Sequence, residues 1–166
     1  MANLARALRE EKIDLLINNA GLLEASSSFG KVDYDEWLEI FQVNSMAPLR
    51  LAERFVDHVA GSDLKLIVNV SSTMGSIGEN DSGGSYIYRS SKAALNMVTR
   101  SLAIDLAPRG ITVIAVHPGW VRTDMGGKDG RLSPEEAAAD LRRLFGDLRP
   151  EDSGTFINHD GRRIGW

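Results

Sequence analysis

The 166-residue chain contains no cysteine, which excludes disulfide bonds and catalysis by a cysteine thiolate. It has no apolar run of membrane-spanning length, and residues 1–11 are charged and amphipathic without the apolar segment of a signal peptide. Excess positive charge is also missing. The net charge of −4 gives no electrostatic reason to expect nucleic acid or an anionic membrane as a partner. We therefore expect a cytoplasmic protein.

Metal-binding patterns are absent as well. The three histidines are His58, His117 and His159, and their positions do not have the spacing of metal ligands. We interpret all three as structural and predict no metal site. Arg142, Arg143 and Arg149 are expected to lie on a solvated helix face.

The composition is that of an ordinary globular protein, since 43% of the residues are hydrophobic and 25% are charged. A chain of this length is long enough to bury a core and is expected to form a single domain over residues 1–166. No repeat or low-complexity segment divides it.

Short apolar runs that suit buried parallel strands alternate with helical patterns along the chain. Strands are predicted at 13–18, 64–70, 111–116 and 156–158. Helices are predicted at 2–11, from Asp33 until Pro48 interrupts the pattern, at 48–60, at 86–107 and after the cap Ser133. This alternation predicts an α/β fold with a parallel sheet and helices on both faces.

Polar or turn-forming segments follow three of the predicted strands directly. They are Asn18 to Gly21, Ser71-Ser72, and His117 to Thr123. Ligands of open parallel sheets bind beyond the carboxyl ends of the strands. We therefore expect these three segments to line one crevice.

Tyr88 and Lys92 are four residues apart in the predicted helix at 86–107 and so share one helix face. A nearby ammonium favours the phenolate, and we expect Lys92 to lower the pKa of Tyr88 for proton transfer near neutral pH. Tyr86 is six residues from Lys92 and is expected to face elsewhere. The alternative is that Tyr88 and Lys92 form an ordinary exposed helix pair.

These segments resemble the short-chain dehydrogenase/reductase family. The resemblance lies in Asn18-Asn19-Ala20-Gly21, in Asn44, in Ser72, in the Tyr88-x-x-x-Lys92 pair, and in Pro118 to Met125. Gly83 to Arg89, His117 to Val121 and the closing Asn158 to Trp166 are similar to the C-factor (C-signal) branch of that family, which includes small carbonyl reductases.

The resemblance implies a Rossmann-like fold and hydride transfer between NAD(P)(H) and a small carbonyl or alcohol. It implies that Tyr88 donates the proton, Ser72 hydrogen-bonds the carbonyl oxygen, Lys92 holds the nicotinamide ribose, and Asn44 positions a water. The implied cofactor-binding residues are Asn18, Ala20, Gly21, Tyr88, Lys92, Pro118, Gly119, Val121 and Thr123. Branch resemblance favours NADP over NAD. Loops 73–85 and 124–133 are expected to cover the substrate.

Structural roles remain open for several of these residues. Ser72 and Thr123 could cap turns, and Asn44 could be a buried polar residue that bends a helix near Pro48. Asn18 to Gly21 could terminate a strand, and Pro118 with Gly119 could end another.

One family feature is missing from these 166 residues, the Thr-Gly-x-x-x-Gly-x-Gly turn that binds the pyrophosphate. From the family strand order 3-2-1-4-5-6-7, we expect strands 4-5-6-7, with 13–18 as an exposed edge strand. A second hypothesis is therefore a non-enzymatic, C-factor-like intercellular signal or interaction protein at the cell surface.

The family also implies a homodimer through helices 48–60 and 87–107.

Overall fold

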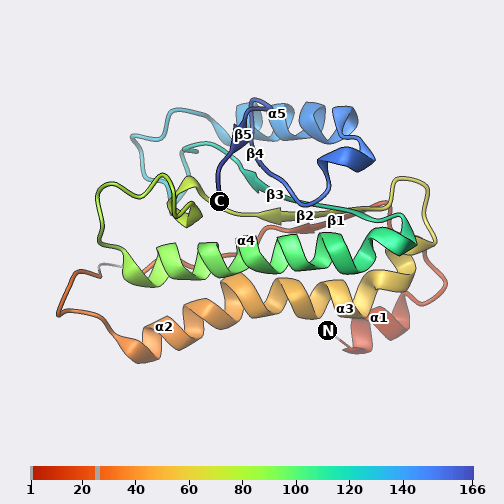
Figure 1. The fold of residues 1–166 in the computed structure, drawn as a ribbon, viewed down its shortest axis with the longest axis horizontal. Helices are drawn as coiled ribbons and strands as arrows, with labels where there is room; N and C mark the ends of the chain where they lie inside the picture. Colours follow the sequence, from red (N-terminus) through yellow and green to blue (C-terminus); the bar gives the residue numbers. More distant parts are fainter. Residues whose placement is uncertain (1, 25–26) are drawn as a thin grey trace.

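A five-stranded sheet forms the centre of the protein in the computed structural model, which describes residues 2–24 and 27–166 (Figure 1). The strands lie in the order β1-β2-β3-β4-β5. They are β1 (Leu15–Asn18), β2 (Leu66–Val70), β3 (Thr112–His117), β4 (Phe156–Asn158) and β5 (Arg163–Ile164). The first four strands are parallel, and β5 runs antiparallel to β4. The predicted α/β class is confirmed, and β1 is an edge strand as expected.

Helices cover both faces of the sheet (Figure 1). Helices α3 and α4 lie on one face and α5 on the other, while α2 continues into α3 and α1 lies beside α3. The helices are α1 (Ala2–Ala7), α2 (Tyr34–Phe41), α3 (Ala47–Ala60), α4 (Tyr86–Leu106) and α5 (Pro134–Asp147). In the described part of the chain, none of them is long and apolar enough to cross a bilayer.

Alternating side chains of the two central strands build two apolar cores. Ile67 and Val113 are fully buried on the face of α3 and α4, where they join Val59. Val68 and Ile114 are fully buried on the opposite face, which α5 covers. Because both faces are covered, these strands are apolar at nearly every position, which is why they could be predicted from the sequence.

A π-helical turn at Gln42–Met46 joins α2 to α3. The predicted break at Pro48 is therefore wrong, since the chain stays helical from Tyr34 to Ala60. Proline lacks an N–H and clashes with the preceding turn. The wider π turn, closed by a bond from Ala47 N to Gln42 O, accommodates Pro48 at the start of α3.

The strand β5 was not predicted because it has only two residues. The expected Asp160-Gly161 turn connects it to β4, with Asn158 N donating to Arg162 O over 2.8 Å. The predicted caps are present at both helices: Asp33 accepts from Glu36 N, and Ser133 forms a reciprocal capping box with Glu136.

Candidate active site

The carboxyl ends of β1, β2 and β3 lie side by side, so the three predicted segments follow neighbouring strands. Asn18 pairs in register with Asn69 of β2, and Asn69 pairs with Ala115 of β3. The loop after β1 and the turn after β2 contact α4, which carries Tyr88 and Lys92: Ser85 N donates to Ser27 O over 2.8 Å, and a Cβ on Gly75 would lie 2.7 Å from Lys92 Cβ. Parallel-sheet proteins bind their ligands at this edge of the sheet.

Tyr88 lies in the first turn of α4, and the Ser72 side chain is close enough to its hydroxyl to lower the Tyr88 pKa. Both residues are 8% exposed, whereas Tyr86 is 41% exposed. Ser72 also accepts a bond from Met74 N over 3.2 Å and so caps the short 3₁₀ turn at Thr73–Gly75. This contact supports the interpretation of Ser72 as a turn cap, while its role toward a carbonyl oxygen remains a prediction.

Lys92 lies one helical turn below Tyr88 and is 4% exposed. Its Nζ donates to the carbonyl oxygen of Val70 over 2.9 Å and lies 5.6 Å from the centre of the Tyr88 ring. Gly75 packs directly against it, since a Cβ on Gly75 would lie 2.7 Å from the Lys92 Cβ. The turn that begins at Ser72 thus packs on the helix that carries the lysine.

Burial is the largest influence on the pKa values of Tyr88 and Lys92. The Tyr88 pKa is raised above its usual value of 10.0, first because burial disfavours the phenolate. The Ser72 side chain lowers the pKa of Tyr88, and Glu24 raises it. Burial lowers the pKa of Lys92 to about 8.

These protonation states correct the expectation that Lys92 lowers the Tyr88 pKa. The expectation considered only the attraction between an ammonium and a phenolate. In the folded protein both groups are buried, so the cost of desolvating each charged form outweighs that attraction. The phenol is therefore in its protonated, proton-donating form at neutral pH.

Asn44 lies in the π-helical turn and is 1% exposed. Its Oδ1 accepts from Leu22 N over 2.8 Å, and its Nδ2 donates to Leu22 O over 2.8 Å and to Ser91 Oγ over 2.9 Å. The side chain therefore joins the loop after β1 to α4. This contact supports the structural interpretation of Asn44, while its role toward a water remains a prediction.

Asn18 begins a buried row of polar side chains that crosses the sheet toward α4. Its Nδ2 donates to Asn69 Oδ1 over 2.7 Å, and Asn69 Nδ2 donates to Thr99 Oγ1 over 2.9 Å. The Asn18 Oδ1 is buried and has no partner among the described residues. Ala20 is exposed just beyond the strand.

The loop after β3 folds back on itself. Leu132 N donates to Trp120 O over 3.0 Å, which forms part of a bridge between Val121 and Leu132. Gly119 has a φ of 85°, and a Cβ there would lie 2.6 Å from Leu132 Cδ1, so the position requires glycine. The exposed Thr123 accepts from Gly126 N over 3.1 Å, which supports its interpretation as a turn residue.

The residues present fit the nicotinamide end of a dinucleotide. A Cβ on Gly21 would lie 3.3 Å from Asn44 Oδ1 and 3.5 Å from Lys92 Nζ, so the missing side chain leaves the lysine approachable from the loop. Lys92 has one acceptor, the Val70 carbonyl oxygen, among residues 2–24 and 27–166, although an ammonium carries three N–H groups. The Asn18 Oδ1 is a further unpartnered acceptor at the same sheet edge. A glycine-rich turn for the pyrophosphate is not in the sequence.

The sequence interpretation missed Glu24 and Ser27, which the structure places beside the start of α4. Glu24 is 5% exposed and accepts from Ser27 Oγ over 2.8 Å. Both residues lie in a Ser- and Gly-containing segment without periodicity, where no pattern distinguishes a buried carboxylate from a solvated one. Proximity to Tyr88 is the only signal, and it exists only in the folded chain.

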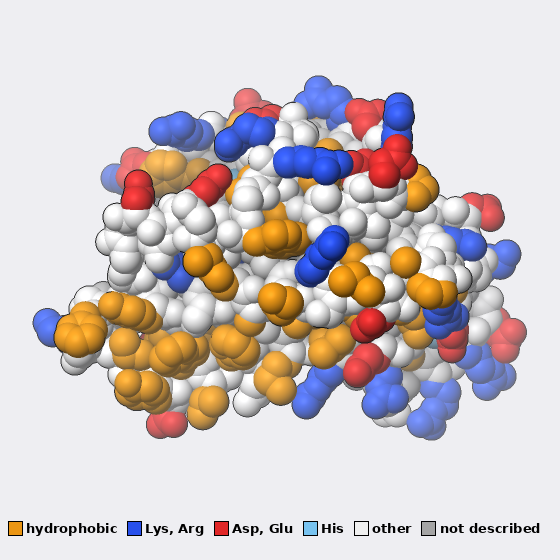
Figure 2. Space-filling model, in the orientation of Figure 1, with side chains coloured by type: hydrophobic (Ala, Val, Ile, Leu, Met, Phe, Trp, Pro, Cys, Tyr) orange, Lys and Arg blue, Asp and Glu red, His pale blue; other side chains and the backbone are white. Residues whose placement is uncertain are grey.

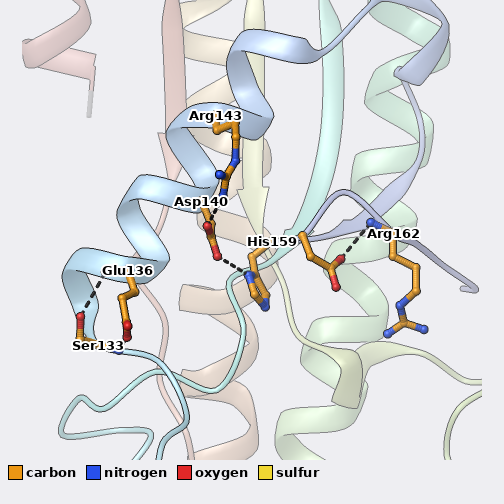
Figure 3. A network of polar contacts seen from close by, with 7 residues as sticks. Ser133, Glu136, Asp140, Arg143, His159 and Arg162 are labelled. Carbon is orange, nitrogen blue, oxygen red and sulfur yellow. Dashed lines mark hydrogen bonds and ion pairs between the residues drawn. The ribbon is translucent and has the colours of Figure 1, made fainter.

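A separate cavity of about 490 Å³ lies between α5 and the β4–β5 hairpin, away from Tyr88. Figure 3 shows its polar contacts: His159 Nδ1 lies 2.8 Å from Asp140 Oδ2, and Arg143 also pairs with Asp140. The predicted structural role of His159 is consistent with this pairing. Across residues 2–24 and 27–166, no group of three or more histidine, cysteine or acidic residues could hold a metal ion.

Comparison with known proteins places these observations in a family. A family model described as "short chain dehydrogenase" matches residues 1–132. The C-signal of Myxococcus xanthus is 40% identical over 154 residues, which cover 93% of each chain. The 1-hydroxy-2-glutathionyl-2-methyl-3-butene dehydrogenase of Rhodococcus sp. (strain AD45) is 38% identical over 169 residues, covering 98% of this chain and 74% of that protein.

Solved structures give the same result. The carbonyl reductase Sniffer of D. melanogaster superposes with a TM-score of 0.92 and 34% identity, covering 99% of this chain and 71% of that one. An NADPH-bound carbonyl reductase from chicken fatty liver superposes with a TM-score of 0.89 and 34% identity, with 99% and 70% coverage.

Proposed function

The chain belongs to the short-chain dehydrogenase family, and from that membership we infer that it is an oxidoreductase that reduces a small carbonyl compound to an alcohol with NAD(P)H. The observation that carries this proposal is the burial of Tyr88 and Ser72, both 8% exposed, with Lys92 Nζ 5.6 Å from the centre of the Tyr88 ring. A phenol and a second hydroxyl that lie together in a buried site can bind one carbonyl oxygen.

Residues of this chain would stabilise the carbonyl oxygen of the substrate and protonate it. The bound cofactor supplies the hydride that adds to the carbonyl carbon. As the carbonyl oxygen gains negative charge, the Ser72 hydroxyl donates a hydrogen bond to it and the Tyr88 hydroxyl donates its proton. The raised pKa of Tyr88 keeps that proton available at neutral pH. Lys92 lies below the phenol, and its N–H groups that have no acceptor in the described part of the chain would donate to the ribose hydroxyls.

We propose NADP as the cofactor. Two solved relatives are described with NADPH or NADP bound, the chicken reductase and a short-chain dehydrogenase from Burkholderia multivorans. We propose that Asn18, Ala20, Gly21 and Lys92 contact the nicotinamide end. We propose that four residues of the loop after β3 also contact the nicotinamide end of the cofactor: Pro118, Gly119, Val121 and Thr123.

The test is turnover of small ketones and aldehydes with NADPH and NADH, followed by nicotinamide absorbance. Tyr88→Phe removes the transferable proton and is expected to lower kcat by at least about 100-fold. Tyr86→Phe removes a hydroxyl two residues away on an exposed side chain and is the matched control. Turnover that survives Tyr88→Phe, or none with any carbonyl tested, would contradict the proposal.

A second candidate is a non-enzymatic signal or interaction protein. The observation that favours it is the similarity to the C-signal of Myxococcus xanthus, which is 40% identical over 154 residues. Titration of the protein with NADPH, followed by nicotinamide fluorescence, separates the two candidates. Micromolar binding supports the reductase, and no binding at millimolar cofactor supports the signal.

We also propose a homodimer through helices 48–60 and 87–107. Figure 2 shows apolar side chains gathered over α2 and the neighbouring parts of α3 and α4. Met97 and Ile104 of α4 are 67% and 60% exposed, and Leu49 of α3 is 36% exposed. A reductase of this kind would act in the cytoplasm, whereas the signal candidate would act at the cell surface.

A further inference from the structure

Two buried side chains hold the turn that carries Ser72 against α4. Ser71 Oγ donates to Asn96 Oδ1 over 2.6 Å, and Asn96 Nδ2 donates to Gly75 O over 3.1 Å. Ser71 and Asn96 are each 3% exposed. One side chain of α4 therefore binds the turn on both sides of Ser72, which lies between two anchored points.

The turn between these two points is closed by its own hydrogen bonds. Gly75 N donates to Ser72 O over 2.8 Å, and Met74 N donates to Ser72 Oγ over 3.2 Å. These bonds fix the shape of the turn, because they join residues within it. The position of the turn on α4 depends instead on bonds between the turn and the helix. Asn96 makes such bonds at two places.

On the helix side, this contact belongs to the row of residues that includes the catalytic pair. Tyr88, Lys92 and Asn96 follow one another at four-residue spacing, so each lies beside the next on the buried face of α4. A Cβ on Gly75 would lie 2.7 Å from Lys92 Cβ, and Lys92 Nζ lies 5.6 Å from the centre of the Tyr88 ring. A shift of the turn along α4 would therefore move Ser72 relative to Tyr88.

The same bonds explain why a polar side chain is buried at position 96. Burying an amide costs free energy unless its polar atoms are hydrogen-bonded. Both Oδ1 and Nδ2 of Asn96 have a partner. An apolar side chain there would take these partners from the Ser71 hydroxyl and from the carbonyl of the buried Gly75. A buried polar network whose members are all bonded specifies one arrangement of the elements that it joins.

We propose that Asn96 and Ser71 are positioning residues: together they hold the turn on α4 so that the Ser72 hydroxyl and the Tyr88 phenol reach the same carbonyl oxygen. The inference rests on the proposed reductase function and adds two residues to it. Both act through Ser72 and do not contact the substrate. The two hydroxyls come from different elements, since Ser72 follows β2 and Tyr88 lies on α4, and a small error in their relative position lowers the rate sharply.

A double-mutant cycle with Ser72 tests this role. Ser71→Ala is expected to lower kcat for ketone reduction with NADPH about 10-fold, because the turn loses one of its anchors. In a Ser72→Ala background the same change is expected to lower kcat less than about 2-fold, since the hydroxyl that it positions is gone. An equal loss in both backgrounds would show a general structural effect and overturn the proposal, as would an unchanged kcat in Ser71→Ala.

Ser62→Ala is the matched control, because Ser62 is a buried serine that precedes β2 whereas Ser71 follows it. Ser62 is 4% exposed, its hydroxyl donates to Val59 O over 2.8 Å, and it accepts from Lys65 N over 3.2 Å. This variant loses comparable hydrogen bonds away from Ser72 and is expected to keep its kcat. Circular dichroism and thermal melts establish that the variants compared are folded.

Asn96→Ala removes both anchors and provides a second variant. We expect its kcat to fall at least as far as that of Ser71→Ala, about 10-fold or more. Adding Ser71→Ala to it should lower kcat by less than about 2-fold further, because the two residues share one bond. Fully multiplicative losses would contradict a common action through the turn.

Amide hydrogen exchange without cofactor distinguishes failure of this inference from failure of the reductase proposal. The amides of Met74 and Gly75 donate within the turn, so their exchange reports how often the turn opens. Ser71→Ala is expected to speed their exchange about 10-fold, and Ser62→Ala is expected to leave it unchanged. Faster exchange in a protein that turns over no carbonyl would reject the reductase function. Turnover with unchanged exchange in Ser71→Ala would reject the role of Ser71 and Asn96 alone.

Discussion

Buried charges in this protein carry an energetic cost that can be measured residue by residue. Lys92 and Tyr88 are both buried, and in each case burial favours the uncharged form. A depressed lysine pKa and a raised tyrosine pKa affect the pH dependence of stability in opposite directions. The two contributions occupy different pH ranges and can be separated.

Lys92 is expected to make the protein more stable as the pH rises from about 8 to 10.5. Over that range the unfolded chain holds a proton on Lys92 that the folded protein has released, so the free energy of unfolding increases with pH. The full contribution is about 3 kcal/mol, and Lys92→Met is expected to abolish it. Urea unfolding at several pH values from 7 to 10 measures it. A flat profile in the unmodified protein would contradict the expectation.

His117 is expected to cause a loss of stability in acid. Burial is the largest cause that lowers its pKa to about 4, followed by His159 and Arg162, while Asp160 raises it. Between pH 6.5 and about 4 the unfolded chain binds a proton that the folded protein does not, so stability falls as the pH falls. The expected loss is about 2 to 3 kcal/mol in urea unfolding. His117→Gln should lack this loss if the histidine is its source.

At the scale of elements, the candidate site depends on short segments packed on α4. The π turn presents Asn44 to the loop after β1, and the 3₁₀ turn after Ser72 contacts Lys92. Wider and tighter helical turns of this kind are common at functional sites because they redirect side chains.

Gly75→Ala tests this close packing. The new Cβ would lie 2.7 Å from Lys92 Cβ and 2.8 Å from its backbone carbon, so the 3₁₀ turn must shift away from α4. We expect a loss of about 1 to 3 kcal/mol in unfolding free energy and a fall in reductase activity. Gly146→Ala in α5 has no neighbour within 4 Å and should instead stabilise by up to about 1 kcal/mol. If the two variants have equal unfolding free energies, the protein tolerates a Cβ at position 75 and the close packing against Lys92 does not constrain it.

At the scale of the whole molecule, an apolar surface extends over the helices on one face of the sheet. If this surface joins two copies, Ile104→Glu is expected to convert a dimer to a monomer, because it would place a charge inside the interface. Sedimentation velocity measures the change. Ala138→Glu, on the exposed face of α5, is the control and should leave the dimer intact. A dimer that survives Ile104→Glu uses another surface.

Three features of the fold differ in how far they could be predicted from the sequence. Strands β2 and β3 could be predicted because burial on both faces makes them apolar throughout. The caps Asp33 and Ser133 could be predicted because capping is local. The predicted break at Pro48 was wrong because a π-helical turn just before the proline lets the chain stay helical, and no local sequence pattern indicates such a turn.

The sequence alone determined the alternation of strands and helices, the order of the segments at the sheet edge, and the family to which they belong. Only the tertiary structure decided the protonation of Tyr88, because burial and the neighbouring Glu24 act through space between segments distant in the chain. Local patterns record which residues must be apolar or must cap a helix. They do not record the solvation of a charge, which depends on everything that packs around it.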